Sequence, residues 1–441
     1  MQTFRSENSF DDGVRRVGET AALVRAQAAY GAKFASAAGD GAAERNLPFD
    51  PSPRVISADD FARLERGLLQ RVAALNLFLS DVYGDAKILK DGVVPKDFVL
   101  SSVGFLPQCV GIKPRGGVYA HVAGIDLVHT DEGKWYVLED NLRVPSGAAY
   151  PLSARRAMRD CGISESGIED SLGYGKMLKD ALDFFSSGGI RAVLTSGVGN
   201  CAYYEHSVLA ELTGSALCEG RDLFVDGDVL YFRGADGVER VGALYSRVDG
   251  AYADPLSLKS DSFVGVPQLF SAYASGNVAV LNAFGCGVAD DKGVYRYVPE
   301  LIKYYLGESP VFENAPTYLP VIKSELDYIA ENLSRLVVKS VDGSGGHGVV
   351  FGLTLSEEQK DSLMRDIVRS PRSYIAQEVI NFESLPTADG ERKADFRAFV
   401  VTGETPKVWR SGLTRYAGSD GGLKVNSSQG GGFKDTWVLS R

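Results

Sequence analysis

The chain has 441 residues, a net charge of −10 and an isoelectric point of about 5.1. This length predicts roughly two to four domains, and the acidic balance argues against a protein that binds nucleic acid or an anionic membrane surface. Apolar runs stay short of the about 18 residues that span a membrane, the first residues are polar, and the five cysteines are scattered without a C-x-x-C pair. We therefore expect a cytoplasmic protein without a zinc or redox motif.

The first part of the sequence predicts helices. Residues 1–50 mix alanine with glycine and aspartate, and we expect a loose helical extension there. Residues 57–84 carry apolar side chains at helical spacing, with Ser57 as the N-cap and Asp60 three positions later. This pattern predicts an amphipathic helix whose apolar face packs in the core.

Strands follow from residue 117 onward. The alternation over residues 117–141 predicts a β-hairpin, and residues 189–214 give a strand, a glycine turn and a helix, as in a βαβ unit. Residues 221–234 predict a second hairpin with an Asp-Gly turn. The remaining predicted elements are helices at 298–307, 322–336 and 356–370, and extended segments at 337–352, 373–380, 395–403 and 426–439. Together they predict an α/β (α+β) fold.

A glycine-rich loop behind a lysine is the first candidate for chemistry. In the stretch VVKSVDGSGGHGVVFG, Lys339 ends a β-branched run and the loop Gly343–Gly348 follows, including Ser344, Gly345 and Gly346. Glycines let the backbone approach a ligand closely, and exposed amides beside a lysine can bind a phosphate. The lysine precedes the glycines, so the loop is not a P-loop. A flexible surface hairpin would give the same pattern, and a second lysine, Lys292 in GVADDK, would by itself be a solvated side chain.

Three oxygen-bearing side chains of the hairpin at 117–141 are the second candidate. With a four-residue turn at 131–134, the predicted pairs are Asp126 with Glu139, Val128 with Val137, and Thr130 with Trp135. Paired residues share a face, so Asp126, Glu139 and Asn141 are expected to converge. Two such carboxylates repel unless a cation lies between them, and hard oxygen ligands suit Mg²⁺. The alternative is an exposed acidic hairpin.

Arginines near the end of the chain form the third candidate group. Arg397 lies in a predicted strand, Arg410 and Arg415 lie in WRSGLTRYA, and a glycine-rich turn follows from Asn426 to Gly432. Strand-borne arginines beside such a turn can stabilise an anion, and Arg247 in LYSRVDG is a further candidate. Each arginine taken alone could also be an ordinary surface residue.

In combination, these segments resemble the ATP-grasp superfamily. Lys292, Lys339, the glycine loop and AQEVI occur in the order of the two lysines, lid loop and hinge strand of that superfamily. The resemblance implies that the Gln377 side chain and the backbone near Glu378 and Ile380 face adenine. It also implies that Asn426, in the glycine-rich turn, lies in the nucleotide site.

The order of the segments is similar to a circular permutation. The Asp … Glu-x-Asn hairpin that ends other glutathione synthetase-like members occurs near the start here, as Asp126 … Glu139-Asp140-Asn141. VLEDNLRVPSG, EGRDL, GVADDK and NSSQGGGFKDTWVL resemble the circularly permuted ATP-grasp type 2 family, relatives of glutathionylspermidine synthase. The domains implied are a helical extension (1–50), a permuted ATP-grasp segment with the metal hairpin (51–160), a Rossmann-like pre-ATP-grasp substrate domain (161–290) and the ATP-grasp lid and nucleotide core (291–441).

The resemblance implies an ATP- and Mg²⁺-dependent carboxylate–amine ligase that works through an acyl-phosphate. Lys292, Lys339 and the loop would hold ATP, the acidic hairpin would hold Mg²⁺, and Arg397, Arg247 and Arg415 would neutralise charge. The partners implied are a small-molecule or peptide carboxylate and an amine, whose identities the sequence leaves open, as it does the oligomeric state. Two other functions stay open: an ATP-binding scaffold or regulator without turnover, and a small-molecule kinase.

Overall fold

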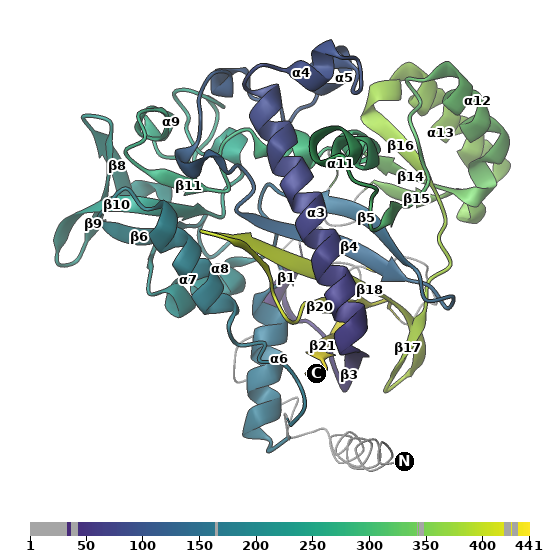
Figure 1. Cartoon of the computed structure of the whole chain (residues 1–441), viewed down its shortest axis with the longest axis horizontal. Coiled ribbons are helices and arrows are strands. Elements are labelled where there is room, and N and C mark those ends of the chain that lie inside the picture. The colour runs from purple at the N-terminus through teal and green to yellow at the C-terminus, as the bar shows by residue number, and fades with distance from the viewer. Residues whose placement is uncertain are drawn as a thin grey trace.

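The computed structural model describes residues 33–36, 43–163, 166–341, 343, 348–418, 425 and 431–441. Residues 49–56 and 432–438 pair in a central sheet, and two further units with sheets of their own lie beside it (Figure 1). Within these ranges, the chain forms no helix of the length and apolar character needed to cross a membrane. The domain boundaries predicted from the sequence stay a prediction.

The central sheet joins strands from both ends of the chain. Its strand order is β12-β5-β4-β18-β20-β21-β3, and β17 and β19 also pair with β18. The strands are β3 (Phe49–Ile56), β4 (Val122–His129), β5 (Trp135–Asn141), β12 (Glu313–Asn314), β17 (Ser384–Thr387), β18 (Gly390–Thr402), β19 (Pro406–Val408), β20 (Leu413–Tyr416) and β21 (Gly432–Val438). β4 runs antiparallel to β18, and β21 runs parallel to β3. These pairings bring the predicted acidic hairpin against the arginine-bearing strands of the C-terminal region.

Helix α3 (Ala58–Val82) crosses one face of this sheet (Figure 1). The predicted amphipathic helix is thereby confirmed to within two residues at each end, and its apolar positions Phe61, Leu64 and Leu68 are buried. Spacings of three and four residues place these side chains on one face, which packs in the core. From the same helix, Arg71 donates to both carboxylate oxygens of the buried Asp140 at 2.6 and 2.7 Å, which fixes the helix to β5.

Replacement of the N-cap of α3 gives a first prediction. The Ser57 hydroxyl accepts a hydrogen bond from the Asp60 N–H at 3.1 Å, and Ser57→Ala removes that acceptor. We expect the free energy of unfolding to fall by about 1 kcal/mol, measured by urea denaturation. Ser80→Ala, at an exposed position inside the same helix, is the matched control and should not destabilise the protein. An equal loss in both variants would contradict the capping role.

A second, mostly parallel sheet lies to one side, at the left of Figure 1. Its parallel strands are β6 (Ile190–Leu194), β7 (Ala216–Cys218), β10 (Gly237–Ser246) and β11 (Ala279–Leu281), in the order β7-β6-β10-β11. β8 (Leu223–Asp226) and β9 (Val229–Gly234) extend it as the predicted hairpin. Helices α7 (Tyr174–Phe185), α8 (Tyr203–Thr213) and α9 (Leu269–Ala274) belong to this unit. The strand–turn–helix unit predicted at residues 189–214 is confirmed, and the unit is Rossmann-like.

A third unit with its own small core lies at the upper right of Figure 1. Its sheet has the order β13-β16-β14-β15, and helices α12 and α13 pack with it. The bounds are β13 (Thr317–Tyr318), β14 (Leu336–Ser340), β15 (Val349–Phe351), β16 (Tyr374–Glu378), α12 (Lys323–Asn332) and α13 (Glu357–Arg369). The other elements are β1 (Lys33–Ser36), β2 (Ala43–Asn46), α4 (Lys87–Lys90), α5 (Lys96–Leu100), α6 (Ala149–Asp160), α10 (Lys292–Tyr295) and α11 (Val298–Leu306). Lys339 lies on β14 and pairs with Val349 across the predicted hairpin.

Two predictions about local structure were wrong. The helical extension over residues 1–50 does not continue through β1 and β2, which pair as an antiparallel ribbon, and β3 begins at Phe49. Helix propensity is a weak preference that strand pairing overrides. The helix predicted at 322–336 ends at Asn332, because the chain tightens into a short 3₁₀ turn before β14 begins at Leu336. The rest of the expected extension up to β2, residues 1–32 and 37–42, lies outside the described residues.

Candidate active site

The acidic hairpin contains a β-bulge that sets its register. Asp126 pairs with Glu139 as predicted, but Leu127 pairs with Val137, so Leu138 is an extra residue on β5. The predicted pairs Val128–Val137 and Thr130–Trp135 are therefore wrong: Val128 pairs with Tyr136, and His129 with Trp135. A bulge places two residues of one strand opposite one of the other. Because of the bulge, Asp126 still pairs with Glu139, although the strand pairs nearer the turn are shifted by one residue from the predicted register.

Two arginines hold the Asp126 carboxylate. Arg397, which pairs with Asp126 across β18 and β4, donates from Nε and Nη2 to its two oxygens at 2.6 and 2.8 Å. Arg415 on β20 adds a third hydrogen bond at 2.8 Å and also binds Asp395 at 2.6 and 2.9 Å. Burial of Asp126 opposes its ionisation, but the two guanidinium groups outweigh that effect and hold its pKa well below the usual range. Asp126 is consequently a fixed anion that orients both arginines.

Two lysines approach the same hairpin from other elements. Lys292, at the start of α10, lies with Nζ 3.4 Å from Glu139 Oε2 and donates to the Gly343 carbonyl at 2.5 Å. Lys339 on β14 is partly buried, and burial together with the nearby Lys292 lowers its pKa to about 8, while Glu139 and Asp126 act in the opposite direction. The structure thus brings the two lysines, the acidic hairpin and the paired arginines into one site.

The family model for circularly permuted ATP-grasp type 2 proteins matches residues 53–417, which include all of these groups. The chain belongs to this family. Members of the ATP-grasp superfamily are typically ligases that join a carboxylate to an amine with ATP and Mg²⁺, and the expectation of a permuted ATP-grasp fold is confirmed. The circular permutation explains why the acidic hairpin comes before the two lysines in this sequence.

Several proteins are similar to this ATP-grasp chain over most of its length. An uncharacterised protein of Synechocystis sp. is 45% identical over 91% of this chain and 86% of its own length. An uncharacterised protein of Mycobacterium tuberculosis is 43% identical over 90% of this chain and 74% of its own. A protein of Frankia alni, provisionally named a glutamate–cysteine ligase, is 42% identical over 90% of this chain, which spans only 48% of that longer protein.

A solved structure supports the same fold. The apo form of a glutathione synthetase-like effector from Globodera pallida superposes with a TM-score of 0.57 and covers 95% of this chain and 96% of its own. Sequence identity is 12%, so the likeness concerns the fold alone. The overall fold is therefore shared with a protein of very different sequence.

The predicted adenine hinge lies at the end of β16. The Gln377 side chain is buried and donates to Thr317 Oγ1 at 2.9 Å, while the Glu378 carboxylate accepts from the Tyr328 and Tyr318 hydroxyls at 2.6 and 3.3 Å. Both side chains already have partners in the protein, so the backbone is the better candidate for contacting a base. Ile380 follows the strand, and within the described residues its N–H has no backbone partner.

The oxygen donors of the hairpin fit a magnesium ion. The Glu139 side chain is 26% exposed, and Asn141, opposite Gly124, has a buried Nδ2 without a partner in the described part of the chain. A 180° rotation of an amide exchanges its oxygen and nitrogen, so Asn141 can offer its oxygen there. Asp126 uses three of its roughly four acceptor positions on arginines and keeps one. The described residues form no cluster of three or more His, Cys, Asp or Glu ligands, so substrate phosphate oxygens would have to complete the shell.

Arg247 joins the site through residues that the sequence did not single out. It is buried and donates to Ser146 Oγ at 2.5 Å and to Glu205 Oε1 at 3.4 Å. Arg397 donates to the carbonyl of the same Ser146 at 3.0 Å. Ser146 lies inside the VLEDNLRVPSG motif, so its place in the site could have been inferred from the sequence. Glu205 lies on α8, and its sequence context is that of an ordinary helix.

Some predicted site residues lie elsewhere or outside the described residues. Arg410 is 45% exposed and pairs with Glu169 at 3.4 Å and Glu65 at 3.7 Å, so it does not join Arg397 and Arg415. Neighbouring positions in sequence diverge because the chain turns between β19 and β20. The predicted loop residues Ser344, Gly345 and Gly346, and Asn426 of the glycine-rich turn, lie outside the described residues.

Proposed function

We propose that the protein is an ATP- and Mg²⁺-dependent ligase that activates a carboxylate as an acyl-phosphate and joins it to an amine. One observation carries the proposal: Lys292 Nζ lies 3.4 Å from Glu139 Oε2, and Glu139 also acts on the pKa of Lys339, although the hairpin comes from the first third of the sequence. Family membership supports the ligase class. The Frankia alni relative carries the name of an enzyme that joins a carboxylate to an amino group, but the chain spans about half of that protein, so its substrates do not transfer.

The two lysines would hold the phosphates of ATP. Their ammonium groups lie close together and partly buried, an arrangement that costs energy in the free protein and favours an anionic ligand. Lys292 also binds the Gly343 carbonyl, so it connects the acidic hairpin with the first residue of the predicted lid loop. Closure of that loop over the phosphates would exclude water and protect an acyl-phosphate from hydrolysis.

The hairpin would hold Mg²⁺ through Glu139, Asn141 and the remaining lone pair of Asp126. When bound, the metal would supply charge neutralisation on phosphate oxygens. The chain's own contribution is orientation: the Asp126 carboxylate binds Arg397 and Arg415 on adjacent strands and so holds both guanidinium groups beside the hairpin. Preorganised cations of this kind stabilise charge as it moves during the reaction.

The arginines would orient the reacting groups in two successive steps. First, a carboxylate oxygen attacks the γ-phosphorus, and the bond to the ADP oxygen breaks, giving an acyl-phosphate and ADP. Second, the amine nitrogen bonds to the acyl carbon as the carbon–oxygen bond to phosphate breaks. Two protons leave the ammonium in all, one to the released phosphate and one to solvent. Arg247, whose buried Nε has no partner among the described residues, could donate to a substrate oxygen near Ser146.

Calorimetry and product analysis test this function directly. We expect ATP to bind in the presence of Mg²⁺, and we expect ADP release when pooled amino acids, polyamines and small peptides are added. Absence of ATP binding would overturn the proposal. A stable phosphorylated product formed without an amine would instead indicate a kinase, and binding without any phosphate release would indicate a scaffold.

The Glu139→Gln variant gives a second prediction. It removes a metal-binding charge and the partner of Lys292, so we expect ADP release to fall by about 100-fold or more while the melting temperature changes little. Glu132→Gln, at the exposed turn of the same hairpin, is the matched control and should keep full activity. Equal rates for Glu139→Gln and the wild type would contradict a role for this carboxylate.

A further inference from the structure

A cavity of about 430 Å³ lies at the carboxyl ends of two parallel strands. Ser246 and Val248 follow or end β10, and Asn282 and Ala283 follow β11; all four line the cavity. In parallel α/β sheets, ligands bind outside the carboxyl ends of the strands. The volume is in the range of small-molecule sites. None of the catalytic, nucleotide or metal residues predicted from the sequence lines this cavity.

The lining of the cavity combines an apolar interior with charged groups of both signs. Its apolar lining includes Val248, Val280, Ala283 and Phe284. Its charged lining consists of Arg143, Asp249 and Lys259. Arg143 Nη1 lies 3.3 Å from Asp249 Oδ2, and the Lys259 ammonium lies 3.9 Å from the centre of the Tyr252 ring. The charged lining can therefore meet both an anionic and a cationic group of one ligand.

Arg143 connects this cavity with the candidate active site. The Asp290 carboxylate accepts from the backbone N–H groups of Leu142 and Arg143 at 2.7 and 3.0 Å and from Arg143 Nε at 2.9 Å. Arg143 follows Asn141 by two residues, and Asp290 precedes Lys292 by two. The wall of the cavity is thus built by the continuations of the two segments that carry the proposed metal and phosphate ligands.

We propose that this cavity binds the amine substrate, and that the substrate is an α-amino acid zwitterion with an apolar side chain. Arg143 and Lys259 bind its carboxylate, Asp249 binds its ammonium group, and the apolar lining receives its side chain. The inference rests on the proposed ligase function and extends it to the class of the second substrate.

The same charges disfavour two other ligand classes. A polyamine carries several ammonium groups, but Asp249 is the single carboxylate of the cavity lining, and Lys259 would repel a polycation. A covalent site at Cys286 is also disfavoured: burial raises the pKa of this thiol well above its usual value, and the thiol donates to the Leu142 carbonyl at 3.3 Å. A protonated, hydrogen-bonded thiol is a wall of the cavity and not a nucleophile.

Ligand analogues test the assignment on the full chain. Binding of L-alanine, L-valine, L-leucine, L-methionine and L-phenylalanine is measured by calorimetry, alone and with a non-hydrolysable ATP analogue and Mg²⁺. We expect at least one of them to bind at least 10-fold more tightly than the analogues that lack its carboxylate or its amino group, and more tightly than spermidine. Failure of all five to bind, or tighter binding of spermidine, would overturn the proposal.

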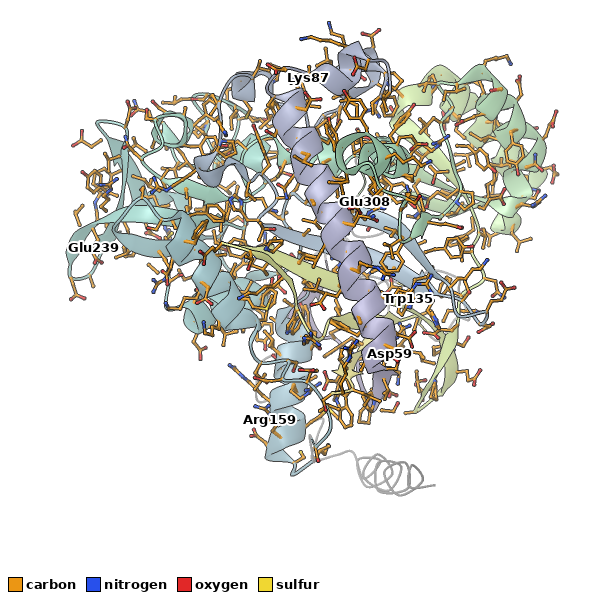
Figure 2. The ribbon with its side chains drawn as sticks, in the orientation of Figure 1. Asp59, Lys87, Trp135, Arg159, Glu239 and Glu308 are labelled. Carbon is orange, nitrogen blue, oxygen red and sulfur yellow. The ribbon has the colours of Figure 1, made fainter. Side chains whose placement is uncertain are left out.

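Variants connect that binding to the cavity. Asp249→Asn keeps an oxygen acceptor for the Ala251 N–H and so preserves the local turn, but we expect it to weaken amino-acid binding by at least 10-fold. Lys259→Met, at a surface position, is expected to weaken it by about 3-fold or more. Glu239→Gln, at the far edge of the β8–β10 region, is the matched control (Figure 2). Unchanged affinity in both cavity variants would overturn the inference.

Nucleotide binding separates this inference from the proposed function. ATP and Mg²⁺ should bind to Asp249→Asn within about twofold of the wild-type affinity, because Asp249 is not among the proposed nucleotide or metal ligands. If the wild type fails to bind ATP, the ligase function fails. If ATP binding is normal and the cavity variants bind and use the amino acid as the wild type does, the cavity assignment alone fails.

Discussion

Asp126→Asn is expected to lower the free energy of unfolding by about 3–5 kcal/mol. The wild-type carboxylate is 3% exposed and receives three hydrogen bonds from Arg397 and Arg415. Asparagine keeps the volume but removes the charge. Two largely buried guanidinium groups are then left with Asp395, which binds Arg415, and with Glu139, whose Oε1 lies 3.9 Å from Arg397 Nη2. Urea denaturation followed by circular dichroism measures the loss, and ATP-dependent turnover should disappear with it.

A double variant isolates the cause of that loss. Asp126→Asn combined with Arg397→Met removes one charge of each sign, so we expect it to be more stable than Asp126→Asn alone. Arg415 then keeps Asp395 as its partner at 2.6 Å. If the single variant loses less than about 1 kcal/mol, or if the double variant is the less stable of the two, the charge balance of this network is not what holds the strands together.

Lys339→Met is expected to abolish nucleotide-dependent activity without destabilising the protein. Methionine has a similar length and lacks the ammonium group, which in the free protein is disfavoured by burial and by Lys292. The variant should therefore unfold at the same or higher urea concentration, whereas ATP affinity and ADP release should fall by about 100-fold or more. Lys303→Met, at an exposed position on α11, is the matched control for both measurements.

The pH dependence of ATP binding checks the same lysine. The pKa of Lys339, about 8, lies below the ordinary value of 10.5, so the Lys339 side chain is mainly neutral in the free protein above pH 8. Bound phosphates favour the charged form, and ATP binding should then take up close to one proton and weaken by up to about 10-fold per pH unit. Calorimetry in buffers of different ionisation enthalpy measures that proton, which should be absent in Lys339→Met.

Folding stability should respond to pH in a defined direction as well. Between pH 8 and 10.5 the unfolded chain holds a proton on Lys339 that the folded chain has lost, so this residue makes stability rise with pH in that window. Lys339→Met should remove that rise. An identical pH profile of stability in both proteins would show that the pKa of Lys339 is not lowered in the free protein.

Local sequence patterns predicted much of the site because its parts are short regular elements. The apolar spacing and Ser57 predicted α3, strand alternation placed Glu139 and Asn141 on one face, and the run before Lys339 predicted β14. Each of these depends on neighbours within a few residues along the chain, where side-chain periodicity is fixed by backbone geometry. The order of the two lysines and the hairpin was sufficient to indicate a permuted ATP-grasp chain.

Contacts between distant segments could not be read in the same way. The bulge at Leu138 depends on how β4 fits between β5 and β18, and nothing in its own sequence requires it. Ser146 and Glu205 are ordinary residues until Arg247 is buried between them. Arg410 looked equivalent to Arg415 in sequence, but the chain turns it towards Glu65 and Glu169.

The sequence by itself determined most of the elements, the family and the identity of the charged groups, because these follow from local periodicity and from the order of short motifs. The tertiary structure alone decided which charges meet: the pairing of β4 with β18 sets Asp126 against Arg397, and the cavity beside Arg143 forms where two strands end side by side. The physical reason is that burial and pairing are properties of several chain segments at once. The energy of a charge depends on neighbours far away in sequence, as Arg397 is from Asp126.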